Sequence, residues 1–220
     1  MPIFGYILVV LIAYLLGSIP TGFLVAKARG VDIRSVGSGN IGATNVFRIL
    51  GKTAGVFVLL ADAAKGWLAV VLVAEWVCDS FYPAASPLAR EWFRLCAGIA
   101  AILGHNYTCW LYFKGGKGIA TSAGVLVALV WLPLLIILGV WVVVFAASRY
   151  VSLASICASF VLPFAAWFTG KNLATVIVTA ALAALAIYKH KANIQRLIKG
   201  TENRIGTKKP LPTEAPKPTA

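Results

Sequence analysis

Acidic residues are scarce in this 220-residue chain: Asp and Glu number 7, against 20 Lys and Arg. Charged residues of both signs make up only 12% of the sequence, and no long polar insert separates the apolar runs. Several of these runs approach or exceed the ~20 residues that a helix needs to cross a bilayer. The composition therefore predicts a polytopic membrane protein without a soluble domain.

The apolar runs also lack the alternation of a membrane β-barrel, so we expect an all-α bundle of membrane helices. The first run starts at Ile3 without a basic n-region or a small-residue cleavage site, and we interpret it as a retained span. None of the cysteines has C-x-x-C spacing, so we predict packing roles and no metal site. These cysteines are Cys78, Cys96, Cys109 and Cys157.

Two familiar catalytic patterns are missing as well. Neither His105 nor His190 has an aspartate five residues later, which excludes a His-x4-Asp acyltransferase dyad. Lys117 is followed by Gly118, where a P-loop NTPase requires Ser or Thr. Any phosphate chemistry in this chain must therefore use another arrangement.

The formal net charge of +13 would suit nucleic acid, but the basic residues cluster in short flanks of the apolar runs. This is the positive-inside pattern of membrane proteins, so we expect membrane lipids and no nucleic acid as partners. It predicts a cytoplasmic C-terminus and an outside N-terminus. The clusters are Lys27, Arg29, Arg34, Arg48 and Lys52, then Lys114 and Lys117, then eight bases from Lys189 to Lys217.

We predict seven transmembrane helices. A single helix over residues 119–147 would be about 44 Å long, too long for a ~30 Å core without strong tilt. Basic residues flank this region on both sides, which requires an even number of crossings, and Pro133 supplies the break. The spans are Ile3–Ala26, Thr53–Val77, Trp92–Phe113, Ile119–Trp131, Pro133–Ala147, Val151–Phe168 and Leu173–Tyr188.

Two further segments follow the last span. Ile194, Leu197 and Ile198 recur at helical spacing among basic residues, which predicts an amphipathic helix on the inner leaflet. Residues 206–220 hold four prolines and three lysines without apolar periodicity, so we expect a disordered basic tail. The membrane domain is thus assigned to residues 1–205.

Two glycine-containing segments, Gly37–Arg48 and Lys114–Gly118, lie between apolar runs and are interpreted as cytoplasmic loops. Glycines let backbone N–H groups converge on an anion, and the basic residues add charge, so we predict phosphate binding. The candidate binding residues are Ser38, Asn40, Asn45, Arg48, Lys114, Gly115, Gly116, Lys117 and Gly118.

With a third segment at His190–Glu202, these motifs resemble those of the bacterial acyl-phosphate:glycerol-3-phosphate acyltransferases (PlsY). The matching residues are Gly37-Ser38-Gly39-Asn40, Ala43-Thr44-Asn45-Val46 and Arg48, then Gly104-His105 and Phe113–Gly118, then His190, Asn193-Ile194, Arg196-Leu197 and Lys199–Glu202. The resemblance covers about residues 3–205. Thr108, Tyr112 and Ala192 depart from the usual family residues, namely proline, glycine and glutamate.

The resemblance implies transfer of a fatty acyl group from acyl phosphate to the 1-hydroxyl of sn-glycerol 3-phosphate at the bacterial inner membrane. The products would be lysophosphatidate and phosphate, with no metal or other cofactor. It assigns Arg48 and Lys117 to phosphate charge, Ser38 and Asn193 to hydrogen bonds, and His190 to the hydroxyl. Gly115, Gly116 and Gly118 would provide a backbone cradle.

Three polar residues remain inside the apolar spans. Asp62 and Lys65 lie three apart and are expected to pair, because an unpaired charge there is costly. His105 is expected to be a buried hydrogen-bonding partner. An organic-phosphate transporter is the alternative function, but it would need polar residues across the whole membrane.

Overall fold

The computed structural model describes residues 3–206, and every regular element among them is helical. The predicted tail falls almost wholly on residues 207–220, outside the described residues. The α-helices are α1 Ile3–Ser18, α2 Thr21–Lys27, α3 Ala43–Leu50, α4 Lys52–Leu68, α5 Ala74–Phe81, α6 Pro87–Asn106, α7 Ile119–Leu129, α8 Trp131–Ser148, α9 Val151–Phe168, α10 Leu173–Lys189 and α11 Lys191–Ile198. A π-helical turn, Ala69–Val73, joins α4 to α5, and a 3₁₀ turn, Cys109–Leu111, follows α6.

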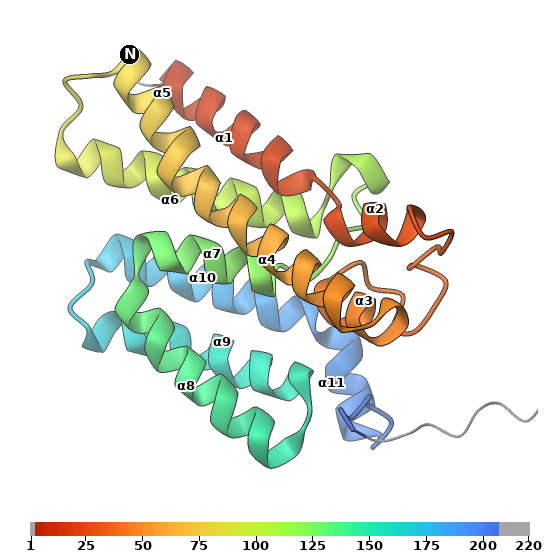
Figure 1. Ribbon diagram of the computed structural model, residues 1–220. Helices are drawn as coiled ribbons and strands as arrows, with labels where there is room; N and C mark the ends of the chain where they lie inside the picture. The colour runs from red at the N-terminus through yellow and green to blue at the C-terminus, as the bar shows by residue number, and fades with distance from the viewer. Residues whose placement is uncertain (1–2, 207–220) are drawn as a thin grey trace, which may run out of the picture.

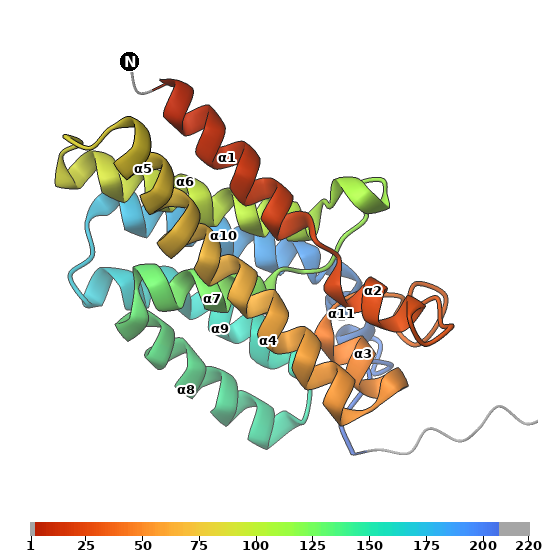
Figure 2. The same cartoon turned by 45° about the horizontal axis from the view of Figure 1, so that its top comes forward.

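The helices form an elongated bundle (Figures 1 and 2). Helix α1 lies on one side of it and α8 on the opposite side, with α4, α7 and α10 between them. The short helices α2, α3 and α11 gather at one end, and the α5–α6 connection lies at the other. The three motif segments therefore share one end of the bundle.

Within residues 3–206, four stretches are long and apolar enough to cross a membrane: Ile3–Lys27, Lys52–Phe81, Trp131–Ser148 and Val151–Phe168. The pair α10 and α11 makes a fifth if it is counted as one span bent by 56°. Helix α7 is apolar but shorter, and α6 carries charged residues near its start. The protein is thus an all-helical membrane protein, while the count of seven crossings stays a prediction.

The break in the 119–147 region lies at Val130, three residues before the predicted position. Pro133 sits in the first turn of α8, where its missing N–H costs no intrahelical hydrogen bond. Helix α8 then continues unbroken to Ser148. The proline marks the start of a helix here, and the two predicted short helices become one of 11 and one of 18 residues.

Two other boundaries differ from the sequence prediction. The first span is interrupted at Ile19 and Pro20, between α1 and α2. Proline has no backbone N–H and its ring clashes with the preceding helical turn, so α1 cannot continue through it. The third helix ends at Asn106 and not at Phe113, which leaves residues 107–118 as a connection with one 3₁₀ turn. This longer connection carries the second motif.

The predicted loop Gly37–Arg48 is partly helical, which is a correction to the sequence interpretation. Helix α3 buries Val46 and packs against α4, where Gly55 leaves room for Phe47. A Cβ on Gly55 would lie 2.5 Å from the Phe47 Cβ. Eight residues that include Thr, Asn and Val have little helical preference of their own, so tertiary packing decides this element.

Glycines allow the long helices to approach closely. A Cβ on Gly17 of α1 would lie 2.1 Å from the Ala101 carbonyl oxygen of α6. A Cβ on Gly124 of α7 would lie 1.8 Å from the Ala63 carbonyl oxygen of α4. Small residues at such crossings are the usual way for membrane helices to gain packing contacts, and they fix α4, α6 and α7 around the second motif.

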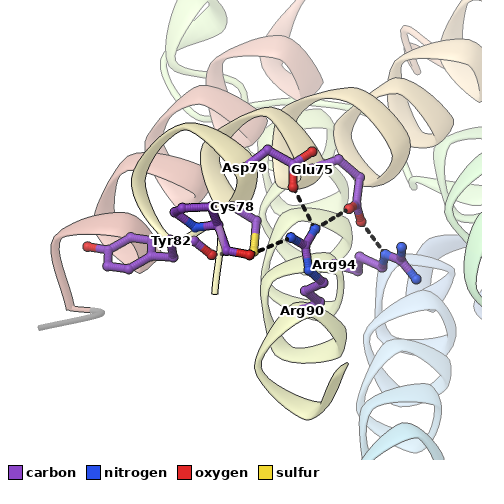
Figure 3. A network of polar contacts seen from close by, with 7 residues as sticks. Glu75, Cys78, Asp79, Tyr82, Arg90 and Arg94 are labelled. Carbon is purple, nitrogen blue, oxygen red and sulfur yellow. Dashed lines mark hydrogen bonds and ion pairs between the residues drawn. The ribbon is translucent and has the colours of Figure 1, made fainter. Parts of the chain in front are cut away.

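Ion pairs tie the far end of the bundle together (Figure 3). Arg90 of α6 lies 3.2 Å from Glu75 and 2.7 Å from Asp79 of α5, and Arg94 also pairs with Glu75. In addition, the Thr175 hydroxyl of α10 donates a hydrogen bond to the Glu91 carboxylate of α6. These contacts lie at the end opposite the motif segments and serve the bundle, not the site.

Candidate active site

A cavity of about 610 Å³ opens among α3, α4, α7, α8, α9, α10 and α11. Its polar end is formed by residues of all three motifs: Ser38, Asn40, Asn45, Arg48, Lys117, Gly118, His190, Asn193 and Glu202. Its other walls are mainly apolar, with Leu126, Leu134, Ile137, Trp141, Phe145 and Leu162, and they also carry Asp62, His105, Ser122, Ser152, Ser155 and Ser159. The cavity can therefore hold a polar group at one end and an apolar chain along the helices.

Lys117 lies just before α7, is partly buried and donates a hydrogen bond to the Asn193 side-chain oxygen. Burial lowers the pKa of its ammonium group to about 8; the Glu202 carboxylate opposes this shift, while Arg196 and Arg48 add to it. An ammonium has three donors, so the contact with Asn193 leaves others for a ligand.

Asn193 is buried on α11 and connects Lys117 to Glu202. Its amide nitrogen donates to the Glu202 carboxylate at 2.7 Å, and the Ser152 hydroxyl and Arg196 guanidinium donate to the same carboxylate at 3.0 and 2.7 Å. Burial raises the pKa of Glu202, but these three hydrogen bonds outweigh it and hold the pKa below its ordinary value. Glu202 is therefore a carboxylate at neutral pH.

Glu202 lies within the third motif but was not among the predicted site residues. The signal was present, since Glu202 is one of only seven acidic residues and follows a basic segment. Its importance becomes visible only when the segment after α11 folds back onto Asn193 and α9.

His190 lies at the junction of α10 and α11 and is 3% exposed. Its Nδ1 is 2.8 Å from the Ala186 carbonyl oxygen, which can only accept a hydrogen bond. Nδ1 therefore carries a proton, and a neutral imidazole keeps the lone pair of Nε2 free to accept a hydrogen bond. The junction of α10 and α11 thus places the Nε2 acceptor of His190 at the cavity.

Arg48 reaches the cavity from the last turn of α3. Its guanidinium is partly buried and donates to the Asn203 carbonyl oxygen at 3.5 Å, so most of its donors are left for a ligand. Burial lowers the pKa of Arg48 from its ordinary value, but arginine stays charged at any physiological pH. Arg48 and Lys117 together give the polar end two cations.

Two amides of the first motif shape the loop that carries Ser38. The Asn45 side-chain oxygen accepts from the Ser38 backbone N–H at 2.9 Å, and its nitrogen donates to the Ile33 and Val36 carbonyls. The Asn40 side-chain oxygen accepts from the Gly42 backbone N–H at 2.8 Å. Both line the cavity, but these polar atoms already have partners within the loop.

The second motif does not form the predicted glycine cradle. Gly115 N–H donates to the Asn106 carbonyl at 3.2 Å, and Gly116 N–H donates to the His105 carbonyl at 3.0 Å, so both amides already have partners within the chain. Lys114 is exposed and does not line the cavity. Of the predicted cradle only Gly118 remains there, at the start of α7.

The comparison with known proteins agrees with this geometry. A family model described as glycerol-3-phosphate acyltransferase matches residues 7–200. The chain belongs to the glycerol-3-phosphate acyltransferase family. This acyltransferase is 48% identical over 200 residues to the glycerol-3-phosphate acyltransferase of Endomicrobium trichonymphae, covering 90% of this chain and 95% of that relative.

Two solved structures also resemble the acyltransferase. Two crystal structures of PlsY (YgiH), an integral membrane glycerol 3-phosphate acyltransferase, each cover 92% of this chain and 96% of their own. The glycerol 3-phosphate form has a TM-score of 0.80 at 42% identity, and the lysophosphatidic acid form 0.78 at 40%. The chain is thus an integral membrane acyltransferase of phospholipid synthesis.

The pKa of Lys117 predicts how the acyltransferase responds to alkaline pH. If the ammonium form binds a phosphate, kcat/KM for glycerol 3-phosphate should fall as the pH rises through about 8, because Lys117 then loses its proton. In Lys117→Arg the cation does not titrate, so the fall near pH 8 should disappear.

Lys114→Arg is the matched control, since Lys114 is exposed outside the cavity and its replacement should leave the alkaline fall in place. Initial rates at saturating acyl donor, measured from pH 6.5 to about 9.5, give both profiles. An unchanged fall near pH 8 in Lys117→Arg would assign it to another group.

Proposed function

We propose that this acyltransferase uses an acyl phosphate as donor and the 1-hydroxyl of sn-glycerol 3-phosphate as acceptor, at the bacterial inner membrane. The observation that carries this proposal is the cavity itself, with two cations at a polar end and an apolar wall from α7, α8 and α9. A long acyl chain matches the wall, and phosphate groups match the cations. The relatives solved in glycerol 3-phosphate and lysophosphatidic acid forms support this acceptor and its acylated product.

The chemistry proposed for this site balances without a cofactor. The acceptor hydroxyl oxygen attacks the acyl carbonyl carbon, an ester C–O bond forms, the C–O bond to phosphate breaks, and inorganic phosphate leaves. The hydroxyl proton passes to a phosphate oxygen. Because the donor is an activated mixed anhydride, the protein chiefly positions two anions and stabilises the charge that develops on the carbonyl oxygen.

The residues divide these tasks by their chemistry. Arg48 and Lys117 neutralise phosphate charge, and Asn193 orients Lys117. His190, with Nδ1 protonated toward Ala186, accepts a hydrogen bond from the acceptor hydroxyl through Nε2. Ser38 supplies a hydroxyl at the edge of the cavity. The first turns of α3 and α7 also line the cavity, and helix N-termini favour anions.

The donor can be tested directly with purified protein in detergent. Palmitoyl phosphate and glycerol 3-phosphate should together release inorganic phosphate and form lysophosphatidate, while palmitoyl-CoA as the only donor should give no product. Phosphate release and product extraction measure both. Turnover with palmitoyl-CoA alone, or turnover with palmitoyl-CoA but none with palmitoyl phosphate, would contradict the proposed donor.

His190→Gln separates orientation of the hydroxyl from proton transfer. Glutamine keeps a hydrogen-bonding group but cannot accept a proton in the working pH range, so we expect kcat/KM to fall on the order of 10- to 100-fold through poorer positioning. Steady-state kinetics in both substrates measure this. A loss of several orders of magnitude with unchanged affinity for glycerol 3-phosphate would mean that His190 is the base and that phosphate does not take the proton.

We also propose seven crossings, with the N-terminus outside and the motif end in the cytoplasm. Support comes from the basic flanks and from the gathering of all three motifs around one cavity. The spans would be α1–α2, α4–α5, α6, α7, α8, α9 and α10.

Labelling of single cysteines in an otherwise cysteine-free chain tests this orientation. Ser35→Cys, Lys114→Cys and Lys199→Cys are exposed positions near the three motifs and should resist a membrane-impermeant maleimide added to intact cells. Ser80→Cys, exposed at the opposite end, is the matched control and should react. Strong labelling at any of the three motif positions would overturn the seven-span arrangement.

A further inference from the structure

Three charged or polar side chains are buried next to the second motif and have no role in the chemistry above. Asp62 and Lys65 of α4 form an ion pair of 2.9 Å, with side chains 2% and 5% exposed. His105 of α6 is equally buried, and its Nδ1 lies 3.7 Å from the Asp62 carboxylate. Lys65 also donates to the Ile19 carbonyl at 2.9 Å, at the break between α1 and α2.

Burying such groups is costly, so they rarely persist inside a membrane protein without a function. Here they join α1, α4 and the end of α6 at one point. The Thr108 hydroxyl adds to this junction by donating to the Ser18 carbonyl at 2.6 Å. The junction is therefore held from three helices.

The second motif rests on this junction through His105. Gly116 donates its N–H to the His105 carbonyl at 3.0 Å. A Cβ added to Gly116 would lie 2.1 Å from His105 Nε2, and the two next nearest atoms also belong to the imidazole ring. The ring thus forms the surface directly behind Gly116, one residue before Lys117.

We propose that His105 is a positioning residue: its imidazole sets the path of the chain at Gly116 and thereby places the Lys117 ammonium for phosphate. This inference rests on the proposed role of Lys117 as a phosphate ligand. Asp62 of the Asp62–Lys65 pair lies 3.7 Å from Nδ1 on one edge of the ring, and the opposite edge faces Gly116. Glycine is required at position 116 because the ring occupies the space that a side chain would need.

The test is a double-mutant cycle with Gly116→Ala and His105→Ala. The added methyl group should strike the imidazole and displace Lys117, raising KM for glycerol 3-phosphate on the order of 10- to 100-fold. His105→Ala alone should raise this KM by about three- to tenfold, since the chain loses its support. The double variant should be better than Gly116→Ala alone, because the clash is gone.

Gly115→Ala is the matched control. A Cβ there would meet backbone atoms, 2.0 Å from the His105 carbonyl oxygen and 2.8 Å from the Asn106 carbonyl carbon. Removal of the imidazole leaves those atoms in place, so His105→Ala should not rescue Gly115→Ala. KM for palmitoyl phosphate and the midpoint of thermal unfolding in detergent are measured for each variant.

We expect KM for glycerol 3-phosphate in the double variant to return to the His105→Ala value, with KM for palmitoyl phosphate changed less than about twofold throughout. The unfolding midpoint should recover with it. Additive losses, a Gly116→Ala protein with normal kinetics, or a double variant that folds less well than Gly116→Ala would each overturn the inference. If Lys117→Ala kept normal turnover, the proposed phosphate role would fail instead, and the two failures are thus distinguishable.

Discussion

The hydrogen bonds of one buried amide hold the polar end of the cavity together. Asn193 accepts from Lys117 and donates to Glu202, so it fixes an ammonium and a carboxylate that come from segments far apart in the sequence. Each of these charges would be costly to bury alone. Ser152 and Arg196 complete the coordination of Glu202, which attaches the chain after α11 to α9. The third motif thus organises the second.

The cost of burying an unpaired charge also explains why the cavity has two different parts. Buried charged groups need several polar partners, and within the cavity these partners converge at the end of the bundle where the short helices α2, α3 and α11 gather (Figure 1). Farther along α7, α8 and α9 the walls are mainly apolar, with a few serine hydroxyls. The proposed acyl phosphate has an anionic head and an apolar tail, so it would fit such a cavity in one orientation, with its reactive carbonyl at the boundary between the two parts.

Much of this protein could be predicted from local sequence patterns. Continuous apolar runs predict membrane helices because the bilayer thickness sets their length, and the all-helical membrane fold and the acyltransferase family were both predicted correctly. The cavity brings together Ser38, Arg48, Lys117, His190 and Asn193, as the motif resemblance implied, although their catalytic roles stay predictions. Residue type and spacing suffice for such conclusions, since they follow from bilayer physics and from the chemistry of each side chain.

Contacts between distant segments decided the rest, and no local pattern contains them. Gly115 and Gly116 have the composition of an anion cradle, but their amides bond to the end of α6, so these glycines serve close packing. Helix α3 forms because α4 offers it a surface at Gly55. The sequence by itself determined the class and the chemical groups available; only the tertiary structure decided which donors stay free for a ligand, because that depends on which partners already occupy the others.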